Sequence, residues 1–376
     1  MVLMHSERER GIIRRMIVDV HCHLALSARR VDPVIERFSF EPEGARGQPG
    51  FDAYIPPRMV RSIPFRVLAR RLGLDASGGP GAELDSEMER VWRYHLLECP
   101  GVEKIALLAF DEYHTDDGDP LGPVGSGMPR GSSLYVSNSL THAWCAAHPQ
   151  KLLFCASVHP YRRGAIEALE EVHARGAVLM KWLPVSQNID PTDERTVTFV
   201  HRAGELGMPF LIHYGGEVTL GRHHAAQENP QPMLELLTRL NHGGVMPPTI
   251  IAHVATPSFP WQRRPWVQYL LDAVTGPLAD APLYADVAAL YYKGAWLKRI
   301  VDDPAFAPIR ERLVFGSDFP VIPNTLFLRR RVRGHRAEIQ AATSWVERSM
   351  QIMRAVGFDE AVFHRGAEVL GLTEGS

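Results

Sequence analysis

The residues that could do chemistry in this sequence are histidines and carboxylates at the ends of short apolar segments. His21 and His23 follow the apolar segment at 16–20, with Cys22 between them. Imidazole nitrogens and carboxylate oxygens are the donors that a borderline divalent cation such as Zn(II) takes. With 17 histidines in 376 residues, a His-x-His pair is weak evidence alone. The meaning of the pair therefore depends on the other polar residues.

The same placement recurs along the chain. His213 and His253 stand at the ends of the fifth and sixth apolar segments, and Asp318 stands at the end of the eighth. A single strand-end histidine such as His253 is more often a hydrogen-bonded polar residue, and Asp318 in "GSDFP" could cap a helix. A buried cluster of such residues is costly without a compensating charge, which a bound metal supplies. We therefore predict a metal site at these strand ends.

Lys181, near the end of the fourth apolar segment, has three interpretations. As an ammonium it cannot bind a cation, but a desolvated lysine could add carbon dioxide and bridge two metals as a carbamate. It could instead bind a substrate carboxylate or pair with an acid inside the barrel, and we favour these two interpretations.

Further polar residues lie close to the same ends. Asp19 has the inward parity of His21 and His23, which suits either an acceptor that orients a ligand ring or a structural interior aspartate. His159 ends the third segment and, like Glu217, could face a substrate. Asp286 is another interior candidate, whereas we expect a surface position for the pair at 223–224.

Eight apolar segments with helix-like stretches between them predict repeated βα units. The segments are 16–20, 104–110, 151–158, 177–183, 209–214, 249–254, 282–288 and 313–318. Amphipathic stretches such as 163–176 and 193–207 end in glycine, as helices before a strand do. We predict a (β/α)8 TIM barrel, in which all these strand ends meet at one mouth. A doubly wound open sheet is the alternative, although the first strand lacks a glycine-rich phosphate turn.

Two connections are longer than simple loops. Residues 24–86 are rich in Pro, Gly and Arg, and residues 111–133 are acidic and then glycine-rich. Both follow strands, so both should lie over the mouth of the barrel as a lid or a substrate-shaping insertion. We expect an N-terminal extension at 1–15 and a single barrel domain at 16–374.

Composition argues against several classes of protein. The chain is 45% hydrophobic and 22% charged, with a formal net charge of -2, so no global charge favours nucleic acid or an anionic membrane. The basic run at 329–336 suits a solvated helix face. The four cysteines have no paired spacing and suggest reduced thiols, and no secretory signal or membrane span stands out. We expect a cytoplasmic protein with a small-molecule substrate, and a homodimer would be compatible with a barrel.

The strand-end motifs resemble the amidohydrolase superfamily, in particular its amidohydrolase-related branch of TIM-barrel metal-dependent hydrolases and decarboxylases. The resemblance spans residues 16–374 and lies in "VDVHCHL", "MKWLPVSQNIDP", "GMPFLIHYGG", "IIAHVA", "LVFGSDFP" and the terminal "GAEVLGL". These motifs are specific for the superfamily and not for a substrate.

The resemblance implies a divalent metal ion, Zn(II) by donor type, bound by His21, His23, His213 and Asp318. His253 would contact the substrate or a second metal, and Asp318 would also transfer protons. Lys181 occupies the place of the bridging carbamate of binuclear members, but this branch often has a lysine there with a single metal. One ion is therefore favoured and two remain open.

The expected reaction is hydrolysis of an ester, lactone or amide bond in a small carboxylated molecule. Asp318 would take the proton of the metal-activated water, while the metal and His253 stabilise the oxyanion. Arginines within 24–86 are candidates for binding the substrate carboxylate. One alternative is non-oxidative decarboxylation of an aromatic or unsaturated acid. The other is a metal-binding barrel without catalysis.

Overall fold

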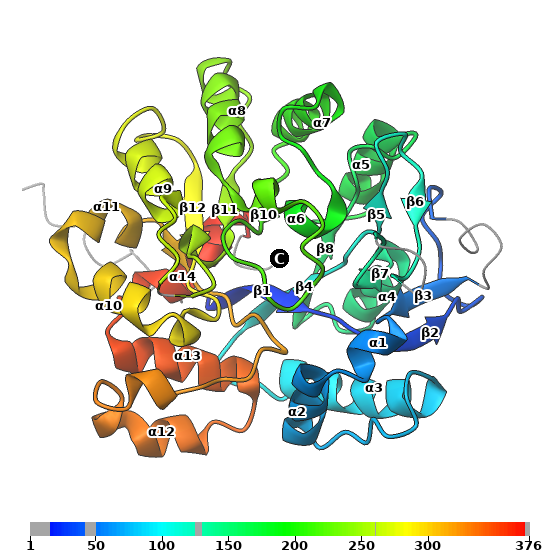
Figure 1. Cartoon of the computed structure of the whole chain (residues 1–376), viewed down its shortest axis with the longest axis horizontal. Helices are drawn as coiled ribbons and strands as arrows, with labels where there is room; N and C mark the ends of the chain where they lie inside the picture. The colour runs from blue at the N-terminus through cyan, green and yellow to red at the C-terminus, as the bar shows by residue number, and fades with distance from the viewer. Residues whose placement is uncertain (1–15, 42–49, 125–129, 260, 373–376) are drawn as a thin grey trace, which may run out of the picture.

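A computed structural model of the chain describes residues 16–41, 50–124, 130–259 and 261–372 (Figure 1). The N-terminal extension predicted at 1–15 lies outside the described residues. Eight parallel strands form the main sheet, and each falls on one of the eight predicted apolar segments. In spatial order they are β1 (Val18–His23), β4 (Lys104–Leu108), β8 (Leu152–Ala156), β9 (Leu179–Trp182), β10 (Phe210–Ile212), β11 (Thr249–Ile251), β12 (Leu283–Asp286) and β13 (Leu313–Val314).

The chain beyond β13 closes the sheet against β1. The Val20 amide donates to the Phe315 carbonyl at 3.0 Å, and the His23 amide donates to the Phe319 carbonyl at 2.8 Å. An isolated parallel bridge also joins Cys22 to Phe319. The first and last strands are therefore neighbours, so the predicted TIM barrel is confirmed and the open-sheet alternative is wrong.

Helices surround the barrel on its outside (Figure 1). The predicted stretch at 193–207 contains one of them, where the Asp193 side chain accepts a hydrogen bond from the Arg195 amide and Phe199 lies on the buried face. The stretch at 163–176 contains another. The helices are α1 (Pro57–Val60), α2 (Ile63–Leu72), α3 (Ala82–Leu97), α4 (Asn138–Ala147), α5 (Ala165–Ala174), α6 (Pro184–Gln187), α7 (Glu194–Glu205), α8 (Gln231–His242), α9 (Trp266–Thr275), α10 (Gly294–Asp302), α11 (Ala307–Arg310), α12 (Arg336–Ala341), α13 (Trp345–Val356) and α14 (Ala361–Val369). Across the ranges described, no helix is long and apolar enough to cross a membrane.

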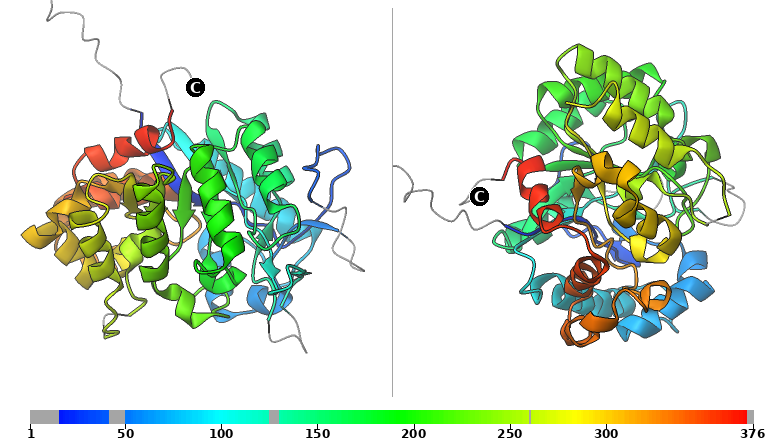
Figure 2. Two further views of the ribbon diagram at one scale, coloured as in Figure 1. Left: turned by 90° about the horizontal axis from the view of Figure 1, so that it is seen from above. Right: turned by 90° about the vertical axis from the view of Figure 1, so that its left-hand side faces the viewer.

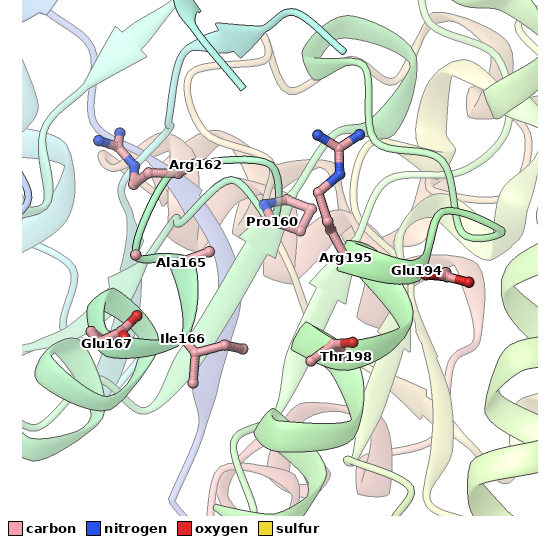
Figure 3. Close-up of a pocket in the computed structure, with 9 residues that line it drawn as sticks. Pro160, Arg162, Ala165, Ile166, Glu167, Glu194, Arg195 and Thr198 are labelled. Atoms are coloured by element: carbon pink, nitrogen blue, oxygen red, sulfur yellow. The ribbon is translucent and has the colours of Figure 1, made fainter. Parts of the chain in front are cut away.

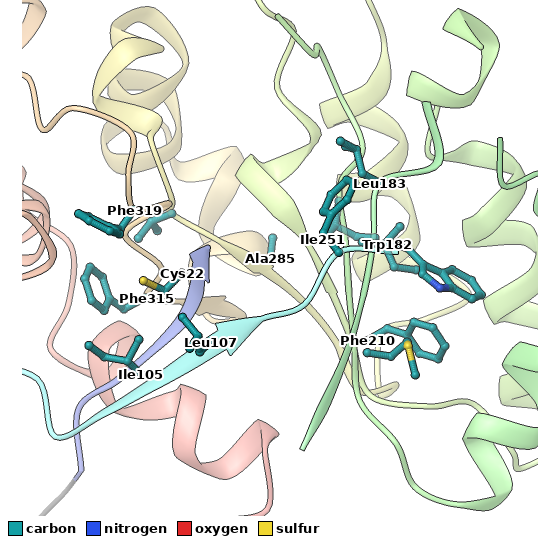
Figure 4. Close-up of a cluster of buried hydrophobic side chains, with 14 of the residues drawn as sticks. Cys22, Ile105, Leu107, Trp182, Leu183, Phe210, Ile251, Ala285, Phe315 and Phe319 are labelled. Carbon is teal, nitrogen blue, oxygen red and sulfur yellow. The ribbon is translucent and has the colours of Figure 1, made fainter. Parts of the chain in front are cut away.

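The core has two layers, as strands covered on both faces require. The outer layer packs between strands and helices, and Figure 4 shows part of it around Cys22, Leu107 and Phe319. The inner layer fills the barrel with side chains that alternate with the outer ones, including Val18, Val20, Ala106, Leu108, Leu179, Leu211, Ile250 and Val314.

Helix α14 packs against β1, and its terminal Val369, together with Leu370, joins the inner layer (Figure 2). The approach is close, because a Cβ on Gly366 would lie 2.8 Å from a methyl carbon of Val20.

The two long connections meet in a small sheet beside the barrel. Strands β2 (Ala28–Arg30) and β3 (Phe51–Tyr54) come from the insertion after β1, and β7 (Tyr135–Val136) follows the second connection and pairs with β3. A further hairpin joins β5 (Tyr113–His114) to β6 (Pro120–Leu121). Trp92 of α3 donates from its indole nitrogen to the His23 carbonyl at 2.9 Å, so helix α3 contacts the end of β1. A lid role for these segments stays a prediction.

Candidate metal centre

A β-bulge in β1 decides which side chains reach the interior. Asp19 lies opposite Ile105 and Cys22 lies opposite Leu107, so Val20 and His21 together face the single position between them. A bulge shifts the alternation of side chains by one residue. His21 and His23 therefore both lie on the inner side, and Cys22 lies on the outer side as expected.

The inward parity predicted for Asp19 is wrong because of this bulge. Asp19 shares the outer face with Cys22, and its Oδ1 accepts hydrogen bonds from the backbone amides of His21 at 3.0 Å and Ser317 at 2.9 Å. Burial raises its pKa to about 7. Asp19 therefore joins the backbone of β1 to that of the closing segment and does not hold a ligand ring.

Three donor atoms meet at the mouth of the barrel. The Nε2 atoms of His21 and His23 are 3.1 Å apart, and Oδ1 of Asp318 lies 3.4 Å from each. His253 adjoins this trio, with its Nε2 3.8 Å from Oδ2 of Asp318. Ligand atoms of His21, His253 and Asp318 all lie within 4.8 Å of one another. The structure thus brings together four of the predicted strand-end residues.

Hydrogen bonds on the far side of two rings fix which nitrogen is free. Nδ1 of His253 lies 2.7 Å from the Ala288 carbonyl, which can only accept, so Nδ1 carries a hydrogen and Nε2 is the nitrogen turned toward the cluster. Nδ1 of His21 lies 2.7 Å from Oδ2 of Asp286 and is fixed in the same way. Asp286, predicted only as an interior residue, is therefore the carboxylate that orients a ring.

His213 lies next to this cluster. Its ring centroid is 4.8 Å from that of His253, and its Nε2 is 3.5 Å from Oε2 of Glu217. This Nε2 is buried and has no hydrogen-bond partner among the described residues. The other oxygen of Glu217 accepts from the Leu220 amide at 2.8 Å, so Glu217 is held toward His213. A buried imidazole nitrogen without a partner is what a missing ligand contact leaves behind.

The protonation states suit metal binding. Burial lowers the pKa of His21, His23 and His213, so these rings are neutral and can offer lone pairs. Burial alone would raise the pKa of Asp318, but the surrounding rings of His21 and His23 lower it below its ordinary value. Asp318 therefore remains an anion among neutral imidazoles.

Two lysines adjoin the cluster. Lys181 is buried, with its Nζ 3.2 Å from Nε2 of His21, and burial lowers its pKa to about 8. Lys293 donates from Nζ to the Pro257 carbonyl at 2.8 Å, and burial lowers its pKa to about 8 as well. Lys293 was not among the residues predicted from the sequence, because it lies in a short turn after β12 and belongs to none of the strand-end motifs.

The backbone is strained at the two ends that carry His253 and Asp318. His253, Val254 and Ala255 have φ angles of 53°, 53° and 50°, and Asp318 has a φ of 58°. Residues other than glycine rarely adopt this left-handed region, and each costs about 1–3 kcal/mol. The Asp318 amide is held by the His21 carbonyl at 2.8 Å. Such strain is typical of residues whose side chains must point in one direction.

Gly316 leaves the room that the His21 ring needs. A Cβ at this position would lie 2.7 Å from Cβ of His21 and 3.3 Å from Cβ of Ala288. Any side chain here would displace the histidine that stands at the centre of the cluster.

His159 lies away from the cluster, in a different environment. Its Nε2 lies 2.7 Å from the Gln187 carbonyl, and its Nδ1 accepts from the Tyr161 amide at 3.1 Å. Its ring lies 4.4 Å from that of His114. Both ring nitrogens are therefore engaged with backbone, and the structure does not place them with the donor atoms.

Some arginines expected to bind a substrate carboxylate already form ion pairs within the protein. Arg37 pairs with Asp52 at 2.8 Å, and Arg29 pairs with Asp32 at 3.4 Å and with Glu89 of α3 at 3.2 Å. We predicted a surface position for His223 and His224, but both side chains are half-buried. Nε2 of His224 lies 2.9 Å from the Tyr113 hydroxyl. The basic run at 329–336 is largely exposed, as predicted.

A separate cavity of ≈ 400 Å³ lies outside the barrel, between α5 and α7 (Figure 3). Its arginines are already paired, Arg162 with Asp111 at 2.8 Å and Arg195 with Asp193 at 2.7 Å. It therefore offers little free charge, and the strand-end cluster remains the candidate site.

The chain was compared with family models, curated proteins and solved structures, and the family comparison gives a match. The sequence model of the family described as "Amidohydrolase" matches residues 130–346, which is more than half of the chain. The chain belongs to the amidohydrolase family. This is a family of metal-dependent enzymes, which include hydrolases and decarboxylases. No curated protein matches the sequence.

Solved structures similar to this amidohydrolase have low sequence identity to it. An uncharacterized TIM-barrel protein from Bordetella bronchiseptica is 15% identical with a TM-score of 0.52, covering 94% of this chain and 98% of its own. A probable 2-pyrone-4,6-dicarboxylic acid hydrolase from Acinetobacter baumannii is 13% identical with a TM-score of 0.47, over 95% and 99%. A 2,6-dihydroxybenzoate decarboxylase from Rhizobium is 14% identical with a TM-score of 0.47, over 95% and 99%.

The residues present fit the metal that the amidohydrolase family implies. Two imidazole nitrogens and one carboxylate oxygen lie within 3.1–3.4 Å of one another, and His213 contributes a buried nitrogen that lacks a partner among the described residues. This donor set suits a divalent ion such as Zn(II). A bound cation would give these buried nitrogens and the carboxylate a common partner.

Proposed function

We propose that this amidohydrolase hydrolyses an ester, lactone or amide bond of a small carboxylated molecule, with a single Zn(II) ion bound by His21, His23, His213 and Asp318. The observation that carries the proposal is the meeting of the His21 and His23 Nε2 atoms with Oδ1 of Asp318 at 3.1–3.4 Å. A bound divalent ion would polarise the carbonyl and make water nucleophilic near neutral pH.

Asp318 is placed to handle the proton. It is an anion beside the expected position of the attacking water, so it can accept the water's proton and return it to the leaving group. Its strained φ of 58° holds the carboxylate toward the cluster instead of along the strand.

His253 is the proposed partner of Asp318 in this scheme. Because its Nδ1 hydrogen is committed to Ala288, its Nε2 is the ring nitrogen that faces Asp318, at 3.8 Å. It would carry a proton between Asp318 and the leaving group, and with a proton on Nε2 it would stabilise the developing oxyanion.

The experiment is a substrate screen of zinc-loaded protein in ¹⁸O-labelled water, with carbon dioxide release followed in parallel. Hydrolysis incorporates one labelled oxygen into a product, whereas the alternative, decarboxylation of an aromatic or unsaturated acid, releases carbon dioxide. Asp318→Asn should lower kcat by about a hundredfold or more. The matched control is Asp272→Asn, an exposed carboxylate on α9 that should leave kcat unchanged.

Three outcomes would contradict the proposal. Carbon dioxide release without labelled oxygen would assign decarboxylation. Unchanged turnover in Asp318→Asn would remove the proton-transfer role. A protein that binds zinc but turns over no ester, lactone, amide or acid would support a barrel without catalysis.

The remaining predictions are physical properties of the protein. A cytoplasmic location and a homodimer are predictions from the sequence, as is the restriction of partners to small molecules without nucleic acid or membrane. Elemental analysis of purified protein tests zinc and its stoichiometry. Light scattering tests the dimer.

A further inference from the structure

Lys293 is held at the mouth by a rigid contact. It follows the short 3-10 helix η3 (Leu290–Tyr292) and precedes α10, and it is half-buried. Its Nζ donates to the Pro257 carbonyl at 2.8 Å. The Gly216 amide donates to the Thr256 carbonyl at 3.1 Å, next to Pro257. The loop that carries this carbonyl is therefore fixed against the end of β10.

The loop at 256–258 packs closely against Gly215 and Gly216. A Cβ on Gly216 would lie 2.2 Å from the Ser258 amide nitrogen, and a Cβ on Gly215 would lie 2.7 Å from the Thr256 carbonyl oxygen. The Lys293 ammonium is thereby oriented before any ligand arrives, which lowers the entropic cost of binding one.

The ammonium has unused hydrogen-bonding capacity. One of its three hydrogens goes to Pro257, and no carboxylate of the described ranges forms an ion pair with it within 4.0 Å. Its charge acts on Glu217 and Asp318 from farther away, and it lowers the pKa of His213. Lys293 is thus beside the cluster and faces no fixed anion.

The balance of charge favours an anionic ligand. With a divalent ion bound, the ion and the ammonium groups of Lys181 and Lys293 outweigh the carboxylates of Glu217, Asp286 and Asp318. Glu228 also acts on Lys293, but it is already paired with Arg222 at 2.5 Å. A neutral substrate would cover the Lys293 ammonium without giving it a partner, which is costly. Lys181 is fully buried with its Nζ 3.2 Å from Nε2 of His21, whereas Lys293 is only half-buried.

We propose that Lys293 is the residue that selects carboxylated substrates, by binding a carboxylate remote from the reacting bond while that bond lies at the His21, His23 and Asp318 cluster. This inference rests on the proposed function and names the recognition element within it.

The test is calorimetric binding of straight-chain dicarboxylates from succinate to adipate, each compared with its monoamide, to zinc-loaded protein. The monoamide keeps one carboxylate for the metal and lacks the second. Wild type should bind the best-fitting dicarboxylate about tenfold or more tightly than its monoamide. Lys293→Met should lose this preference while keeping its affinity for the monoamide, and Lys293→Arg should restore part of it. The control is Lys298→Met, an exposed lysine on α10, the helix that follows Lys293, and it should behave as wild type.

Two results would overturn the proposal: a wild type without preference for any dicarboxylate, or a preference that survives in Lys293→Met. Thermal melting of Lys293→Met establishes that the variant is folded. Because binding is read without turnover, a chain that shows the Lys293-dependent preference but catalyses no hydrolysis would refute the proposed function and leave the carboxylate site standing.

Discussion

Nδ1 of His21 lies 2.7 Å from Oδ2 of Asp286, while Oδ1 of the same carboxylate accepts a hydrogen bond from the His253 backbone amide at 2.7 Å. One buried side chain from β12 thus orients two histidines that come from β1 and from the end of β11. A carboxylate that holds a ligand ring fixes its tautomer and raises its basicity.

Removing this carboxylate should weaken metal binding without removing a ligand. We expect Asp286→Ala to lower zinc affinity about 10-fold to 100-fold, because the His21 ring loses its orientation. Competition with a chromophoric chelator measures the change. Asp280→Ala, an exposed carboxylate before β12, is the control. Equal affinities of the Asp286 variant and wild type would show that His21 is held by its packing alone.

Adding a methyl group at Gly316, beside His21, should weaken zinc binding as the loss of the Asp286 carboxylate does. In Gly316→Ala the new methyl would lie 2.7 Å from Cβ of His21, so the ring must shift. We expect a loss of stability of about 1–3 kcal/mol together with weaker zinc binding. Gly78→Ala, where no atom lies within 4 Å of the added methyl, should change neither. Unfolding in urea and chelator competition check both expectations.

Substitution of Lys181 should show whether the site binds one metal ion or two. Its ammonium lies 3.2 Å from Nε2 of His21, so as a cation it repels an ion bound there. Lys181→Met should therefore keep one zinc per chain and bind it severalfold more tightly. If Lys181 were a bridging carbamate, the same variant would instead lose a metal ion. Elemental analysis and chelator competition, in buffer with bicarbonate, separate the two cases.

His95, whose ring packs against Phe319 with centroids 5.3 Å apart, should make stability depend on pH. Its Nδ1 accepts from the Trp345 amide at 3.2 Å, and burial, aided by Arg348, lowers its pKa to about 4. A histidine in an unfolded chain titrates near about 6.5. The unfolded chain thus takes up the proton first, and the free energy of unfolding falls as pH drops from about 6.5 toward 4.

The variant His95→Asn keeps an acceptor and removes this titration. Between about pH 7 and about pH 5 we expect wild type to lose roughly 1–2 kcal/mol more stability than the variant. Urea unfolding of metal-free protein at both pH values measures the difference. Parallel losses in the two proteins would show that the pKa of His95 is the same in the folded and unfolded states, so that burial does not lower it.

The residues that sequence analysis placed correctly share a simple rule. Apolar segments of a parallel barrel end at one mouth, so His21, His253 and Asp318 could be brought together without knowledge of a single distance. The barrel and the family followed from the same rule, since the motifs lie at the strand ends.

The errors arose where the backbone departs from that rule. The bulge in β1 adds one residue and moves Asp19 to the outer face, and no residue type in "VDVHCH" marks it. His159 lies three residues beyond the end of β8 instead of at the strand end, and the Gln187 carbonyl that contacts its ring comes from a different connection. Lys293 lies in a turn whose direction depends on the neighbouring loop at Pro257. The alternation of apolar residues predicts regular strands. The positions of Asp19, His159 and Lys293 depend instead on a bulge and on the loops that join the strands.

The closure of the barrel determines when its chemistry can begin. Asp19 and Ser317, which join the first strand to the last, are separated by 298 residues. During synthesis the histidines of β1 emerge long before Asp318 and the segment that pairs with β1. Until then β1 has an open edge, and contacts over such a separation form slowly. A ribosome-bound chain that ends at residue 312 would hold both histidines but not Asp318, so the proposed metal site can form only after the eighth strand has been made.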